Sequence, residues 1–164
     1  MKYTVADGFP YYIAITDGAN LTDLFHDEAD FKLLSSLNDQ QAGYRYAPGK
    51  WSIRQIIEHI TDHERIMTYR ALRFSRKDDT PLPGYDQDLL VANGRADQLS
   101  LSDLMEDLEN VRKATISFMK NLSAEQLQRK GKAWKFELTV EEFLRATIGH
   151  QLHHMDVIRE KYLK

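Results

Sequence analysis

Four stretches of the sequence repeat apolar residues at intervals of three and four positions, the spacing of one face of an α-helix. The predicted helices cover about residues 20–41, 52–74, 100–122 and 139–164. Two of them open with a capping box, Ser52 with Gln55 and Thr139 with Glu142. Few segments show the alternation of a β-strand. Long amphipathic helices with few strands pack as a bundle, so we expect an all-α, four-helix bundle.

Two connections between the predicted helices are long. Residues 76–100 join the second and third helices and contain Pro81, Pro83 and Gly84. Loops of this size in a compact domain usually carry function or cover another element. The other connection, residues 123–139, is expected to form a short helical turn after Ser123, followed by an extended piece.

Composition limits the class of protein. The chain has 164 residues, and we expect residues 1–164 to form a single domain. It has no cysteine, so a metal site would have to use His, Asp or Glu. The net charge is -3, with Lys and Arg spread along the chain, which argues against a nucleic-acid partner. Neither a signal peptide nor a membrane-spanning stretch is evident, so we expect a cytoplasmic protein with no membrane partner.

Three of the six histidines lie in the last predicted helix, at positions 150, 153 and 154. An α-helix turns about 100° per residue. Measured from Val140, His154 lies about 40° and His150 about 80° from the apolar axis, whereas His153 lies about 140° away, toward solvent. His150 and His154 are four residues apart, so they share one face of the helix, at the border of the core.

The second predicted helix carries another pair with this spacing, His59 and His63. Measured from Ile53, His63 lies about 80° and His59 about 120° from the apolar axis, so facing slightly favours His63 as the one that reaches the interior. Glu64 lies about 20° from the axis, where a buried carboxylate needs a partner. Arg70, an imidazole N–H or a tyrosine hydroxyl could supply it.

This pattern suggests a metal site. Two histidines at i and i+4, with a third from a neighbouring helix, would give three neutral nitrogen ligands and leave a position for water or substrate, as in catalytic sites. Imidazole binds zinc, nickel, iron and copper, so ligand type does not choose the ion. The alternative is that these histidines are hydrogen-bonded or half-exposed residues at helix edges. Two such pairs among six histidines favour the metal site somewhat.

Several motifs, in this order, resemble the DinB superfamily of metal-dependent enzymes, in particular the branch that includes bacillithiol transferases. They are "FPYY", "YAPGKWSIRQIIEH", "ERIMTYRALRF", "TPLPGYDQD" and "GHQLHH". The resemblance covers most of the chain. It implies a DinB-like four-helix bundle with a long loop between helices two and three. It also implies a divalent metal ion held by His59, His150 and His154, which selects His59 over His63 and gives His153 no ligand role.

The resemblance further implies an enzyme with a divalent cofactor, zinc or nickel. The activity it favours is that of a thiol S-transferase, which conjugates a low-molecular-weight thiol to an electrophile. Because the chain has no cysteine, the thiol would be a cosubstrate. Two alternatives remain open: a hydrolase that uses a metal-bound water, and a bundle that binds a metal or ligand without catalysis. Expected partners are a small-molecule substrate, the thiol and a second copy of the chain in a homodimer.

Further residues are candidates for the surroundings of the metal or for the pocket. They are His63, Glu64, Arg70 and Tyr85. Arg70 or Arg73 could bind a carboxylate of the cosubstrate, although a salt bridge or a solvated face is the favoured interpretation. Asp86 and Asp88 could approach the metal from the long loop, although loop capping and turn formation are the favoured interpretation. Both tryptophans, Trp51 and Trp134, are expected to pack.

Overall fold

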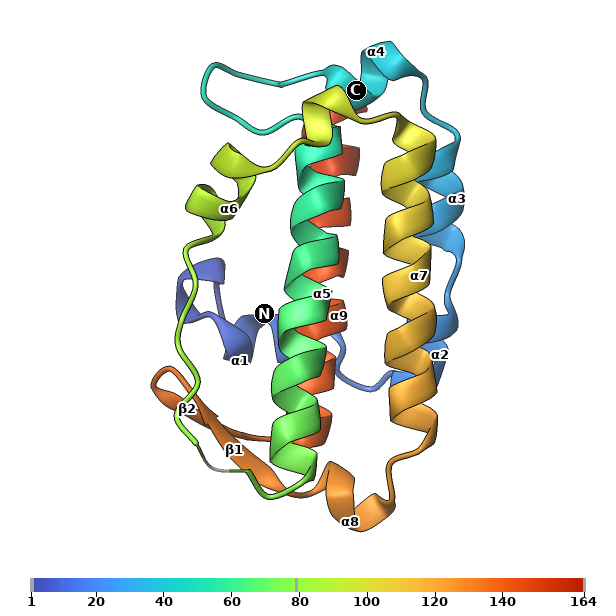
Figure 1. The fold of residues 1–164 in the computed structure, drawn as a ribbon. Helices are drawn as coiled ribbons and strands as arrows, with labels where there is room; N and C mark the ends of the chain where they lie inside the picture. The colour runs from blue at the N-terminus through green and yellow to red at the C-terminus, as the bar shows by residue number, and fades with distance from the viewer. Residues whose placement is uncertain (1, 79, 164) are drawn as a thin grey trace.

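The computed structural model describes residues 2–78 and 80–163, and most of them are helical (Figure 1). Three long helices run side by side along the molecule: α5 (Ile53–Ser75), α7 (Leu101–Lys120) and α9 (Val140–Val157). A fourth column of short helices lies along α7 in Figure 1 and consists of α2 (Leu21–His26), α3 (Ala29–Ser35) and α4 (Asp39–Gly43). The predicted all-α, four-helix bundle is therefore confirmed.

The fourth column is broken, whereas the sequence predicted one helix over residues 20–41. Asp27 has an extended backbone and ends α2, and its carboxylate accepts a hydrogen bond from the Ala29 amide. Asn38 caps α4 and forms a capping box with Gln41. Short polar side chains of this kind compete with helix continuation by bonding nearby amides. The apolar repeat runs through the breaks, so periodicity alone did not reveal them.

The predicted starts of the other helices are confirmed. Ser52 accepts a hydrogen bond from the Gln55 amide, and the Gln55 side chain accepts one from the Ser52 amide. Thr139 and Glu142 form the same reciprocal pair at the start of α9. Beyond α9 the chain continues as a π-helix over Ile158–Tyr162. None of the helices in the described part of the chain is long and apolar enough to cross a membrane.

Both long connections contain short elements. The first holds α6 (Gln87–Asn93), which the sequence did not predict and which Asp86 caps. The second holds α8 (Ala124–Leu127) and an antiparallel hairpin. The hairpin strands are β1 (Lys130–Ala133) and β2 (Phe136–Thr139). The helical turn and the extended piece are thus confirmed. Trp134 lies at the hairpin turn and is 79% exposed, so the expectation that it packs is wrong.

The core consists of two apolar clusters with polar residues between them. One cluster contains four isoleucines of α5 and Met155 of α9; the isoleucines are Ile53, Ile56, Ile57 and Ile60. The other contains the apolar residues of the second half of α5 and the first half of α9, namely Met67, Ala71, Phe74, Val140, Phe143, Leu144 and Ile148. Between them lies a set of buried side chains that we call the polar layer: His59, His63, Glu64, Arg112, Thr115, His150 and Gln151. The candidate site residues therefore belong to a layer that crosses the middle of the bundle.

An N-terminal helix covers this layer from outside. Helix α1 (Phe9–Ile15) packs against α9, and the two backbones meet at Gly149. A Cβ atom added at Gly149 would lie 2.0 Å from the carbonyl oxygen of Tyr12 and 2.8 Å from its carbonyl carbon. Glycine is therefore required for this approach, which brings the Tyr12 ring to 5.2 Å from the His150 ring, between centroids.

We predict that Gly149→Ala destabilises the protein by about 1–3 kcal/mol, the usual range for overpacking. Alanine favours a helix over glycine by about 1 kcal/mol, but backbone atoms of Tyr12 cannot move aside as a flexible side chain would. Urea unfolding measures the change. Gly43→Ala is the control, because no atom lies within 4 Å of the added Cβ there. Equal stability of the two variants would contradict the assigned contact.

Candidate metal centre

Three histidines from two helices converge at the edge of the polar layer, which contains His59 and His150, while His154 is partly exposed beside it. The Nε2 atom of His150 lies 3.1 Å from Nε2 of His59 and 3.2 Å from Nε2 of His154. One ring nitrogen from each residue lies within 4.8 Å of the others. Helix α5 supplies His59, and the i, i+4 pair on α9 supplies the other two. The structure thus brings together the three residues that the resemblance implied as ligands.

His63 lies next to this cluster but does not join it. Its ring stacks on that of His150, with centroids 3.8 Å apart and planes 23° apart. Its Nδ1 lies 2.6 Å from the hydroxyl oxygen of Tyr85. The angle from the apolar axis of α5 favoured His63 as the ring that reaches the interior, and the structure buries both rings against His150. His59 also lies close to His154, with centroids 4.9 Å apart, and this contact with two rings of α9 cannot be read from the facing of α5 alone.

The three Nε2 atoms cannot satisfy one another by hydrogen bonds. Each neutral imidazole nitrogen offers one N–H or one lone pair, so Nε2 of His150 can form one good hydrogen bond, not two. A cation that accepts a lone pair from each ring would satisfy all three. Tetrahedral coordination with bonds of about 2.0–2.1 Å places nitrogen atoms about 3.3 Å apart, close to the two short separations observed. The donor set therefore fits a divalent ion such as zinc or nickel.

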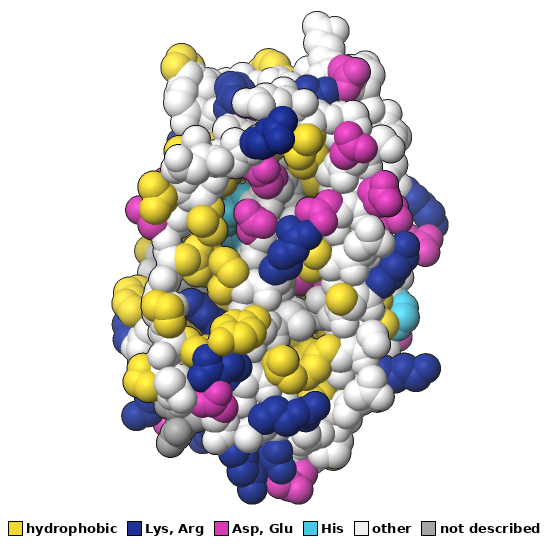
Figure 2. Space-filling view, viewed as in Figure 1, with side chains coloured by type: hydrophobic (Ala, Val, Ile, Leu, Met, Phe, Trp, Pro, Cys, Tyr) yellow, Lys and Arg dark blue, Asp and Glu magenta, His cyan; other side chains and the backbone are white. Residues whose placement is uncertain are grey.

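Burial keeps these imidazoles neutral. His59 and His150 are each 3% exposed, and histidine surface is limited to small patches on the face shown in Figure 2. Burial lowers the pKa of His59 to about 4 and that of His154 to about 2, and it holds the pKa of His150 well below 6.5. Metal coordination requires the unprotonated ring, so the site is prepared for a cation at neutral pH.

Aromatic rings and one cavity surround the cluster. The Trp51 ring lies 4.8 Å from the His59 ring and stacks near His154 at 6.4 Å, between centroids. A surface cavity of about 290 Å³ opens beside His154, with Lys50 and Asp88 also in its wall. Two larger hollows, each about 710 Å³, contain none of the three histidines. We therefore regard the smaller cavity as the route to the cluster.

The long connection is fastened to α5 beside the site. Arg70 donates a hydrogen bond from Nη2 to the Pro83 carbonyl oxygen at 2.7 Å, and its guanidinium lies 5.6 Å from the Tyr85 ring centroid. Burial raises the pKa of Tyr85 to about 12, so its hydroxyl stays protonated at His63. Arg70 and Tyr85 thus hold the loop near the imidazoles, and this engagement of Arg70 leaves less of its guanidinium for a substrate carboxylate.

The partner of Glu64 is a residue that the sequence did not single out. Arg112 of α7 binds the Glu64 carboxylate, with Nη2 and Oε2 2.8 Å apart. Neither Arg70 nor a histidine or tyrosine does so among the described contacts. Arg112 continues the apolar stripe of its helix four residues after Leu108, and that position could have identified it. Arg73 instead pairs with Asp78, as the salt-bridge interpretation expected.

His153 does not belong to the cluster, as both facing and resemblance indicated. It is half-buried rather than turned to solvent, because α1 covers it. Its Nδ1 lies 3.2 Å from the Tyr11 hydroxyl oxygen, and it also lines the cavity beside His154. The covering helix comes from "FPYYIAI", which the helical repeats of the sequence did not include.

Comparisons with known proteins agree with the fold and identify a family. The family model of the DinB superfamily matches residues 29–158. A protein of Oceanobacillus iheyensis is named "putative metal-dependent hydrolase". It is 27% identical to this chain over 128 residues, which cover 77% of this chain and 73% of that protein. YfiT from Bacillus subtilis is described as "a probable metal-dependent hydrolase with an unusual four-helix bundle topology". Its structure superposes on this one with a TM-score of 0.73 and 18% sequence identity, over 98% of this chain and 89% of the YfiT chain. A mycothiol-dependent maleylpyruvate isomerase gives a TM-score of 0.63 at 13% identity, over 94% of this chain and 62% of its own.

We predict that His150→Ala abolishes binding of a divalent ion, whereas His153→Ala leaves the bound metal unchanged. The first change removes the nitrogen that lies close to both others, and the second removes a ring outside the cluster. Elemental analysis of protein purified without a histidine tag measures the metal. The melting temperature should rise on adding metal to His153→Ala but not to His150→Ala. Metal loss in His153→Ala would refute the assigned ligand set.

We also predict that the metal-free protein loses stability as the pH falls from 7 to 5. The unfolded state takes up protons on histidine near pH 6.5, whereas the folded state does not until about pH 4 at His59 and about pH 2 at His154. Each such histidine lowers the unfolding free energy by about 1.4 kcal/mol per pH unit below 6.5. His154→Leu should reduce this slope in urea unfolding, because it removes a histidine that stays neutral in the folded state. A slope equal to that of the wild type would contradict the neutral buried site.

Proposed function

The chain belongs to the DinB superfamily, and on that premise we propose that it is a divalent-metal-dependent hydrolase of a small-molecule substrate. The observation that carries the proposal is the convergence of three neutral imidazoles on one point. His59, His150 and His154 would hold the ion through Nε2. Zinc and nickel are the ions we expect, because the family resemblance implies one of them and both accept imidazole ligands.

A divalent cation in this site supplies Lewis acidity, which polarises a carbonyl or phosphoryl oxygen and makes water a stronger acid. The chain contributes the rest of the environment. Trp51 and Tyr12 flank the imidazoles with apolar rings, which limits water around the ligands and strengthens local electrostatic interactions. Substrate would enter through the cavity beside His154, where Lys50 and Asp88 offer one positive and one negative group at the rim.

Hydrolysis is the activity best supported for this chain, because curated relatives similar to it carry the name of metal-dependent hydrolases. A thiol S-transferase is the second candidate. It is supported by the motif resemblance and by the shared fold with a mycothiol-dependent isomerase. Because the chain has no cysteine, such a reaction would need a low-molecular-weight thiol as cosubstrate. A homodimer remains a prediction from the resemblance.

We predict that untagged protein binds a divalent ion and, once loaded with zinc or nickel, hydrolyses members of an ester, amide and lactone panel without any thiol. Activity should fall to background after chelation and in His154→Ala, since both remove the ligand environment. Parallel reactions with glutathione or bacillithiol and a model alkylating electrophile test the second candidate. Metal-dependent thiol consumption with no hydrolysis would replace the first candidate by the second. A chain that binds no divalent ion would exclude both.

A further inference from the structure

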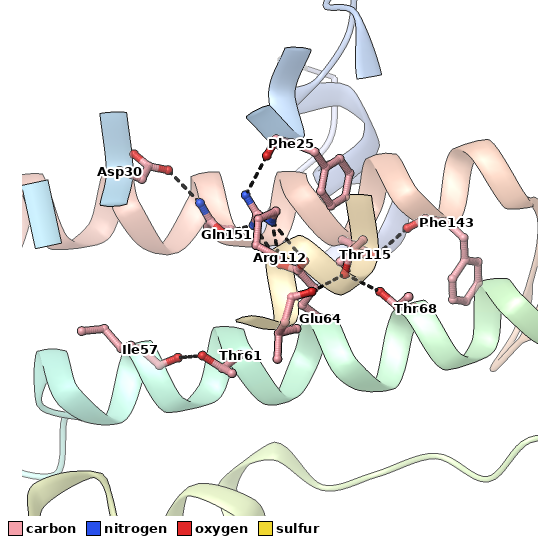
Figure 3. Close-up of polar contacts among 12 residues, drawn as sticks. Phe25, Asp30, Ile57, Thr61, Glu64, Thr68, Arg112, Thr115, Phe143 and Gln151 are labelled. Carbon is pink, nitrogen blue, oxygen red and sulfur yellow. Dashed lines mark hydrogen bonds and ion pairs between the residues drawn. The ribbon is translucent and has the colours of Figure 1, made fainter. Parts of the chain in front are cut away.

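A buried ion pair lies beside the histidines in the polar layer. Arg112 is 5% exposed and Glu64 is 3% exposed. Nε of Arg112 donates to both carboxylate oxygens of Glu64, at 3.1 and 3.2 Å, and Nη2 donates to Oε2 at 2.8 Å. Figure 3 shows the guanidinium of Arg112 between Glu64 and Gln151. The pair therefore has the fork geometry of a strong, directional interaction.

The same guanidinium also reaches α9 and the fourth column. Nη2 donates to Oε1 of Gln151, and Nη1 donates to the Phe25 carbonyl oxygen at 3.4 Å. Gln151 in turn donates from Nε2 to Oδ2 of Asp30 at 3.0 Å (Figure 3). Every nitrogen of the Arg112 guanidinium thus has an acceptor among the described residues. One side chain of α7 ties α5, α9 and the fourth column together.

Stability alone does not account for this arrangement. Apolar residues of similar volume often replace a buried ion pair with no loss of stability, because desolvating two charges is costly. Hydrogen bonds are directional and apolar contacts are not. The bonds of Arg112 therefore constrain the rotation of α5 and α9 more sharply than the two apolar clusters on either side of the polar layer do.

Rotation matters because the bonded residues are close neighbours, along their helices, of the metal-binding histidines. Glu64 lies five residues after His59 on α5, and Gln151 comes directly after His150 on α9. A rotation of about 10° moves an atom about 5 Å from the helix axis by about 1 Å. Metal–ligand distances tolerate only about 0.2 Å. Even a small rotation of either helix would therefore separate the Nε2 atoms enough to weaken metal binding.

We infer that Arg112 is a positioning residue for the metal site: by binding Glu64 of α5 and Gln151 of α9, it fixes the rotation of the two helices that carry His59, His150 and His154. This inference rests on the metal-dependent function proposed above. It assigns Arg112 no contact with substrate or metal. Loss of the network should reduce metal affinity even where the fold is retained.

The test compares the wild type with the double variant Glu64→Met/Arg112→Met, which removes both charges and keeps similar volume. Co²⁺ is titrated into metal-free protein while its visible absorption spectrum is recorded, and urea unfolding measures the fold. We expect the double variant to remain folded, to bind Co²⁺ about 10–100-fold more weakly, and to show altered d–d bands, because the ligand geometry is loosened.

Leu108→Ala is the matched control. Leu108 lies on α7 one turn before Arg112 and is 1% exposed, so its truncation lowers stability through a cavity without removing a hydrogen bond of the network. This variant should bind Co²⁺ within about twofold of the wild type, with the same spectrum. If Leu108→Ala binds Co²⁺ as weakly as the double variant does, Arg112 affects metal binding only through general stability, and the inference is overturned.

Two further outcomes decide the matter. A folded double variant that keeps wild-type affinity and spectrum would overturn the inference and leave the proposed function standing, whereas a wild type that does not bind Co²⁺ would remove the proposed function itself. If the double variant does not fold, Arg112→Lys decides, because lysine keeps the charge but lacks the planar fork. That variant should bind Co²⁺ more weakly with an altered spectrum, and unchanged binding would overturn the inference.

Discussion

The structure depends on the requirement that buried polar groups be paired. Seven polar side chains cross the middle of the bundle between two apolar clusters. An unpaired charge in that position would cost several kcal/mol, so Glu64 and Arg112 can be buried there only as a pair. The carboxylate of Glu64 meets the guanidinium of Arg112, and the imidazoles meet one another. The ion pair is complete within the protein, whereas the imidazole cluster is not.

This difference gives the layer two parts with distinct roles. In the ion pair, every guanidinium nitrogen has a protein acceptor, so that part acts as a fixed tie between helices. In the imidazole cluster, three lone pairs converge where protein hydrogen bonds can use only some of them. Desolvation lowers the pKa of these rings and keeps the lone pairs free at neutral pH. A bound cation would satisfy these lone pairs. The free energy of unfolding is therefore expected to depend on pH and on metal binding.

Elements outside the four columns complete the surroundings of the cluster. Helix α1 reaches the His150 ring through Tyr12 because Gly149 lets the backbones meet. The long connection reaches His63 through Tyr85, which Arg70 holds in place. Access remains beside His154, at the cavity that Lys50 and Asp88 also line. The shape of the site is therefore set by segments that the helical repeats did not include.

The sequence by itself determined the bundle, the starts of its long helices, the shared face of His150 and His154, and the absence of thiolate ligands. These features follow from local rules: an apolar face repeats along one helix, and a cap bonds amides three residues away. Choosing His59 over His63 required the motif resemblance, because the angle from the apolar axis of the helix slightly favoured His63. Only the tertiary structure decided that Glu64 pairs with Arg112, that Tyr12 covers His150, and that the fourth column breaks at Asp27. Those outcomes depend on the direction in which each neighbouring helix lies, and periodicity within one segment carries no information about that direction.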